Sequence, residues 1–113
     1  MDKIAMAQLL KQAKKFQEKL EKAQEELVNL RVESSAGGGM VTAAANGKQE
    51  ILEIKIDPEV LKEDIEMIED LIVAAVNSVL AKASEAANEQ LSKATGGLLS
   101  SLPGGFKIPG FGL

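Results

Sequence analysis

The first thirty residues carry a narrow apolar stripe at helical spacing. Its members recur at alternating intervals of three and four: Met6, Leu9, Ala13, Phe16, Leu20, Ala23, Leu27 and Leu30. This heptad pattern is typical of a helix that buries one face. At 1.5 Å per residue such a helix spans about 40 Å. Because the rest of the chain is too small to cover it, we expect one end of the helix to project.

The pattern changes to short strands between residues 31 and 56. Residues 31–36 predict an edge strand, residues 40–45 a second strand and residues 49–56 a third. The Asn46-Gly47 pair is the preferred sequence for a two-residue type I′ turn, in which both positions need positive φ. The segment therefore predicts a small antiparallel sheet of about three strands. In that register one face of the sheet carries Val41, Leu52, Ile54 and Ile56.

A second long helix is predicted over about residues 63–94. A helical turn precedes it at Asp57-Pro58, where the carboxylate can accept hydrogen bonds from free N–H groups and proline suits the first helical position. The middle of the helix reads LIVAAVNSVLAKA, so its apolar residues cover a wide arc. A helix with this pattern must be buried on more than one side.

Two helices and a hairpin form too thin a layer to bury such a helix from all directions. A second copy of the chain supplies the missing surface, and twofold dimers are the commonest oligomers. We therefore expect a homodimer; binding to a helix of another protein is the alternative. The expected dimer interface combines the sheet and the second helix: Leu52, Ile54, Leu71, Ile72, Val73, Val76, Val79 and Leu80.

The elements together predict an α+β fold with a single α-β-α domain over residues 1–95. Residues 96–113 contain six glycines and two prolines among large apolar residues, without usable periodicity. Gly96-Gly97 is a helix stop signal. We expect a flexible Gly/Pro-rich tail, which either docks on a partner or has no role.

The composition excludes several kinds of chemistry. The chain has no Cys and no His, which removes disulfides, thiolate zinc sites and imidazole catalysis. The glycines at 37–39 lie between two strands, whereas a phosphate-binding loop needs a helix to follow it. The acidic residues of segment 57–70 lack the spacing of a calcium loop. We therefore expect no enzyme, no cofactor, no metal and no small-molecule substrate.

No apolar run approaches the roughly 20 residues that a bilayer-spanning helix requires. No signal peptide is visible either, because the apolar residues of the N-terminal segment are spread at helical spacing. A cytoplasmic protein without membrane contact is the expectation.

The first helix also carries a basic face. Six lysines fall within an arc of about 160°, opposite the apolar stripe. Most such faces are simply solvated, and the net charge of −4 weighs against general nucleic-acid affinity. The functional alternative is a surface that contacts DNA phosphates, with salt-sensitive and weakly sequence-specific binding. The candidate DNA-binding residues are Lys3, Lys11, Lys14, Lys15, Lys19 and Lys22.

The order of the motifs is also informative. The Lys-rich helix is followed by GGGMVTAAANGKQEILEIKIDPE, by EDIEMIEDLIVAAVN and finally by LPGGFKIPGF. In this combination, over nearly the whole chain, the sequence resembles the YbaB/EbfC family of bacterial nucleoid-associated proteins. The resemblance implies a small antiparallel sheet between two long helices, a homodimer with projecting helical arms, and binding to duplex DNA. In the family the projecting helices are the proposed DNA contacts. The resemblance therefore implies DNA contact by the basic residues of the first helix as a group and assigns no role to an individual lysine.

The leading hypothesis is a homodimeric nucleoid-associated protein that binds duplex DNA, organises the chromosome and affects gene expression. The alternative is a protein-interaction adaptor in DNA recombination, repair or replication, which would use the apolar tail and the acidic surface. An enzyme lacks any supporting set of residues.

Overall fold

The computed structural model describes residues 2–96. The predicted tail lies outside the described residues from position 97 onward. The elements confirm the expected α+β class and the order of helix, sheet and helix. They are α1 (Lys3–Glu26), the 3₁₀ turn η1 (Leu27–Asn29), β1 (Val32–Ala36), β2 (Val41–Ala45), β3 (Ile51–Ile56), the 3₁₀ turn η2 (Pro58–Lys62) and α2 (Ile65–Ala94).

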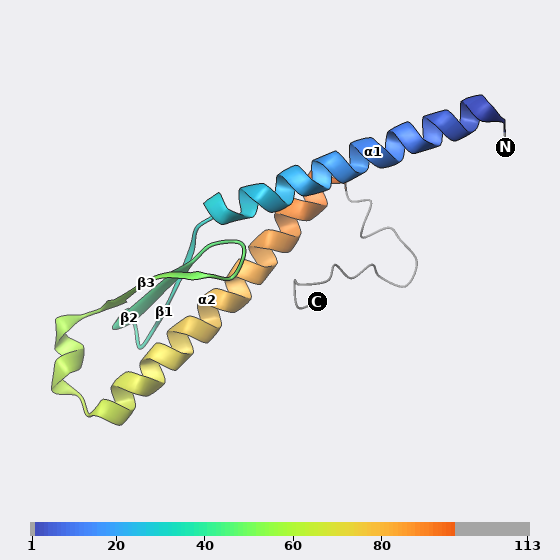
Figure 1. Ribbon diagram of the computed structural model, residues 1–113. Helices are drawn as coiled ribbons and strands as arrows, with labels where there is room; N and C mark the ends of the chain where they lie inside the picture. The colour runs from blue at the N-terminus through green and yellow to red at the C-terminus, as the bar shows by residue number, and fades with distance from the viewer. Residues whose placement is uncertain (1, 97–113) are drawn as a thin grey trace.

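The molecule is strongly elongated. It measures 73 × 26 × 18 Å. Its radius of gyration is 19.7 Å, whereas a compact domain of this length has about 13 Å. Figure 1 shows the cause: α1 crosses α2 near the C-terminal end of α2, and its N-terminal part runs on beyond every other element. The expected projection of one end of α1 is confirmed.

The starts of the helices follow local signals in the sequence. The Asp2 carboxylate accepts a hydrogen bond of 2.7 Å from the N–H of Ala5 at the start of α1. Asp57 accepts one of 2.9 Å from the N–H of Glu59, so the predicted turn at Asp57-Pro58 is confirmed as η2. Asp64 caps α2, which begins two residues later than expected. In each case a carboxylate satisfies an N–H group that the helix itself leaves free.

The sheet is antiparallel throughout, in the order β1-β2-β3. Val41 pairs with Ile56 and Ala43 with Ile54, which places these four side chains on one face, as the sequence predicts for three of them. A bulge interrupts the pairing at Ala44/Ala45. Both β1 and β3 are edge strands, with one side unpaired in the single chain.

The core lies between α2 and the strands β1 and β2. Small side chains dominate it, which lets the helix approach the sheet closely. The cluster consists of Val41, Ala43, Ala45, Ala75, Val79 and Ala83, all without solvent exposure. At the turn after β1, Gly37 has φ of +64°, and an added Cβ would lie 2.7 Å from Cδ2 of Leu71. The glycine run therefore serves a tight turn against α2.

The hairpin between β2 and β3 does not use the predicted two-residue type I′ turn. The N–H of Gln49 donates to the carbonyl of Asn46 at 3.1 Å, and Gln49 has the positive φ, at 61°. The buried Asn46 side chain explains the difference. Its Oδ1 accepts from the N–H groups of Lys48 at 2.9 Å and Glu50 at 3.1 Å, and its Nδ2 donates to the Glu50 carboxylate at 2.8 Å. This side-chain turn favours a longer loop.

In the single chain, the sheet is not enclosed between the two helices. Only α2 covers it. The opposite face carries charged side chains. Arg31 binds the carboxylate of Glu33 at 3.0 Å and that of Glu53 at 3.2 Å, across the small Ala44 of β2. The hydrogen bond with Glu33 raises the pKa of the Arg31 guanidinium. The guanidinium is thereby held to its own sheet.

Candidate nucleic-acid interface

The six candidate lysines all lie on α1, and all are exposed. The helix is held only near its C-terminal end, where Ala23 and Leu27 are buried. Lys19 and Lys22 therefore sit close to the crossing with α2, next to Ala94. The other four lysines, Lys3, Lys11, Lys14 and Lys15, lie on α1 N-terminal to this contact. The structure places these charges along one projecting helix.

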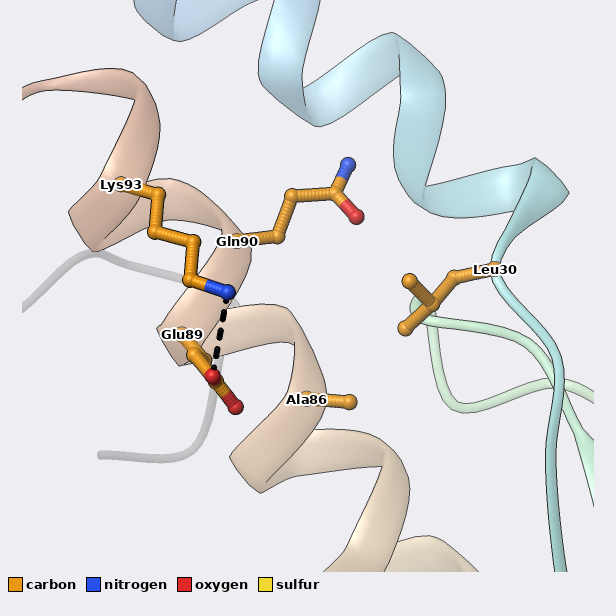
Figure 2. Close-up of a pocket in the computed structure, with 5 residues that line it drawn as sticks. All are labelled: Leu30, Ala86, Glu89, Gln90 and Lys93. Carbon is orange, nitrogen blue, oxygen red and sulfur yellow. Dashed lines mark ion pairs between the residues drawn. The ribbon is translucent and has the colours of Figure 1, made fainter.

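Two hydrogen bonds join α1 and the residue that follows it to the rest of the molecule. The N–H of Gly47, at the hairpin tip, donates to the carbonyl of Leu27 at 2.8 Å. The side-chain amide of Gln90 on α2 donates to the carbonyl of Ala23 at 3.4 Å. Figure 2 shows Gln90 extending from α2 toward α1, with Leu30 beside the crossing. The direction of α1 is thus set jointly by the hairpin and by α2.

The α1 lysines differ from the other cations within residues 2–96. Elsewhere, carboxylates bind Arg31, Lys55, Lys62 and Lys93 at 3.0 to 3.7 Å. Lys82 donates to the carbonyl of Glu33 at 2.8 Å. Within the described residues, no α1 lysine forms an ion pair with a carboxylate. Apart from Lys48 at the hairpin and Lys82, which donates to a neutral carbonyl, α1 therefore holds the lysines of the described chain that form no ion pair.

The hollows beside the crossing do not resemble ligand sites. The one in Figure 2 has a volume of about 220 Å³, and Leu30, Ala86 and Gln90 line it together with the ion pair of Glu89 and Lys93. Ligand pockets are usually concave sites of about 300–1,000 Å³ with convergent polar groups. In the described part of the chain, no group of three or more potential ligand residues is arranged to hold a metal ion.

Negative charge collects at the opposite end of the molecule. The segment 57–70, which forms η2 and the start of α2, contains seven acidic residues and one lysine. Figure 1 shows η2 at the end farthest from the N-terminus of α1. The carboxylates of Asp57 and Asp64 cap η2 and α2. Acidic residues early in a helix also interact favourably with the helix dipole. The chain is thus electrically polarised along its length.

Comparisons with known proteins agree with this arrangement. The model of the YbaB/EbfC DNA-binding family matches residues 2–98. The chain belongs to this family. A nucleoid-associated protein of Ruminiclostridium cellulolyticum is 53% identical over 102 residues, which cover 89% of this chain and 88% of the relative. A nucleoid-associated protein of Xylella fastidiosa is 50% identical over 104 residues. The alignment covers 92% of this chain and 94% of the relative.

A solved structure shares the fold of this chain. The fold is similar to that of the uncharacterized protein HP0035 from Helicobacter pylori, with a TM-score of 0.61 and 25% identity. The alignment covers 79% of this chain and 91% of the other. Membership of the YbaB/EbfC family places the chain among DNA-binding proteins and not among enzymes. Neither described helix is long and apolar enough to span a bilayer.

The YbaB/EbfC chain also exposes an apolar surface beside β3. Ile54 and Ile56 lie on the same side of the sheet as α2 but remain 41% and 43% exposed, because α2 covers mainly β1 and β2. On α2, Lys82 contacts β1, whereas the Leu80 carbonyl accepts from Gln49 next to β3. The β3 side of the helix therefore carries the apolar residues Val73, Val76 and Leu80.

The residues expected at a dimer interface fall into three groups by their exposure. Leu52, Ile54 and Val73 are exposed, and Val73 is 57% accessible. Leu71, Ile72, Val76 and Leu80 are half-buried at the margin of α2. Val79 is instead enclosed between α2 and the sheet of its own chain, since it faces the alanines of β2.

Sequence reasoning missed two parts of this architecture. The bond between Gly47 and Leu27 joins positions twenty residues apart, and no local pattern indicates it. The Arg31 contacts with Glu33 and Glu53 depend on strand register. The alternation of charged residues along β1 and β3 could have indicated these contacts, because residues two apart on a strand share a face.

Proposed function

We propose that the protein is a nucleoid-associated protein that binds duplex DNA through the lysines of α1. The observation that carries the proposal is the row of six exposed lysines on a projecting helix, none of which forms an ion pair with a carboxylate within the described residues. Family membership and the names of the relatives support DNA as the ligand. The site of action is then the nucleoid in the cytoplasm.

The recognition chemistry follows from the residue types. Lysine ammonium groups are compact charges on flexible stems, which suit contact with phosphate oxygens of varied geometry. The proposed surface contains neither arginine nor an aromatic residue on its basic face, so it offers no bidentate base contact. Binding is therefore expected on most sequences. Phosphate contacts of this kind release counterions, which makes the affinity fall steeply with salt.

The acidic end gives the bound molecule an orientation. DNA phosphates repel the carboxylates of segment 57–70 and attract the α1 lysines at the other end. The protein therefore approaches the duplex with α1 first. This polarity reconciles the net charge of −4 with affinity for DNA, because net charge does not describe a local surface.

We further propose that the working unit is a homodimer joined through the apolar surface beside β3. Exposed isoleucines on an edge strand, next to Val73 of α2, support this interface. A second copy would cover this surface and pair or shield the open edge of β3. Each dimer would then present two basic helices, and two linked contacts raise the overall affinity for one duplex. Coating of the chromosome in this way would affect gene expression.

The direct test exchanges charge on α1. The triple variant Lys11→Glu, Lys15→Glu and Lys22→Glu should lose DNA binding in a mobility-shift assay while keeping its circular dichroism spectrum. The matched control is Lys48→Glu, Lys55→Glu and Lys62→Glu, which changes the net charge equally outside α1. Loss of binding in the first variant alone supports the α1 site. Equal loss in both, or retention in both, contradicts it.

A further inference from the structure

The apolar stripe of α1 is covered at one end only. Leu27 is fully buried and Ala23 is 3% exposed where α2 crosses, and Leu20 and Phe16 are half-buried. Farther along, Met6 is 45% and Leu9 is 51% exposed. No described element lies over this part, because α2 ends at Ala94 beside the crossing. We call Met6, Leu9, Ala13 and, at its half-buried margin, Phe16 the free seam.

The free seam continues a contact that the chain already makes. The same heptad stripe packs against α2 in its C-terminal third, so its spacing is that of a helix-packing surface. A stripe of this width fits one further helix. A broad hydrophobic groove or a bilayer would instead require apolar residues over a wider arc.

The borders of the free seam indicate which helix this is. In heptad terms the flanking positions are Ala5, Leu10, Gln12 and Gln17, none of which is charged. Like charges at these positions would repel an identical helix, and opposite charges would select a different one. Neutral borders allow self-pairing without either effect. The lysines lie on the far side of the helix, so a paired helix still presents them outward.

We propose that the free seam of one molecule pairs with the free seam of a second copy, so that neighbouring DNA-bound units are joined through their α1 helices. An antiparallel arrangement keeps the two sheet-bearing bodies apart. The contact comprises only about two heptads, which makes it weak in free solution. On DNA, the high local concentration of bound molecules favours it. The role in coating DNA rests on the proposed function, whereas the pairing itself does not.

The first test measures cooperative coating of a long duplex with uncharged substitutions. The double variant Met6→Gln and Leu9→Gln removes apolar surface from the free seam. Its matched control, Ile4→Gln and Ala7→Gln, changes exposed residues on the lysine side. The seam variant should bind a short duplex with wild-type affinity but lose cooperativity on a long one by about tenfold, or about 1.4 kcal/mol per contact. The proposal is overturned if both variants coat like the wild type.

The second test does not depend on DNA. Because the chain has no Cys, single cysteines report proximity cleanly. In the antiparallel pair Leu9 of one copy faces Ala13 of the other, so a mixture of Leu9→Cys and Ala13→Cys molecules should form disulfide-linked pairs at high salt and high protein concentration. A mixture of Ala7→Cys and Gln8→Cys molecules should not. If residues 97–113 of the same chain cover the seam instead, cross-linking will appear only after their removal, which overturns the proposal. If cross-linking succeeds but no DNA binds, the proposed function fails and the pairing stands.

Discussion

The backbone N–H of Gly47 donates a hydrogen bond of 2.8 Å to the carbonyl oxygen of Leu27, which joins the tip of the hairpin to the end of α1. Leu27 is fully buried at this point. A Cβ on Gly47 would lie 2.9 Å from the same oxygen and 3.1 Å from the Leu27 side chain. The hairpin therefore acts as a bracket that sets the direction of the basic helix.

A side chain at position 47 should disturb this bracket. We expect Gly47→Val to lower the free energy of unfolding by about 1–3 kcal/mol, because backbone must shift to relieve the overlap. Urea unfolding monitored by circular dichroism measures the change. The control is Lys48→Ala, an exposed neighbour that should stay within about 0.5 kcal/mol of the wild type. Equal stability of Gly47→Val and wild type would show that the contact does not constrain the helix.

The Gly47 contact also shows where sequence analysis reaches its limit. Asn46-Gly47 was expected to form a type I′ turn on local preference alone, but the buried Asn46 side chain and the approach of Leu27 favour a longer loop. The helices themselves were predictable, since the period of their apolar residues and the caps at Asp57 and Asp64 are local signals.

The candidate site was predictable in part for a related reason. The angular positions of the α1 lysines follow from helical geometry. Helical geometry does not show whether a lysine forms an ion pair, because pairs such as that of Lys55 with Glu53 depend on the fold. The sequence also indicated that α2 has too much apolar surface. It could not separate Val79, which the sheet of the same chain covers, from Val73, which remains exposed.

The Arg31 bridge should matter little to DNA binding. Its guanidinium already binds Glu33 and Glu53 on the face of the sheet that α2 leaves open. We expect Arg31→Gln to leave the mobility shift unchanged and to lower stability only slightly at low salt, since exposed ion pairs are weak and screened. Urea midpoints at two salt concentrations check the second point. Marked loss of DNA binding would place Arg31 in the interface.

The surface beside β3 should determine whether the protein is a monomer or a dimer. We expect the wild type to sediment as a dimer and Ile54→Glu to sediment as a monomer, because the new carboxylate would be buried without a partner. Analytical ultracentrifugation in dilute solution measures the masses. Ile4→Glu serves as the control, since this residue is 72% exposed at the start of α1, far from β3. A dimer that survives Ile54→Glu would exclude this surface as its interface.

The central claim is that α1 binds duplex DNA through phosphate contacts, and a salt series tests it most directly. Mobility shifts of the wild-type protein on several unrelated duplexes should all occur at low salt. The affinity should fall by about 10³–10⁵ between 50 and 200 mM salt if roughly six to ten phosphates are contacted. Binding to one sequence alone, affinity that does not change with salt, or no shift at low salt would contradict the claim.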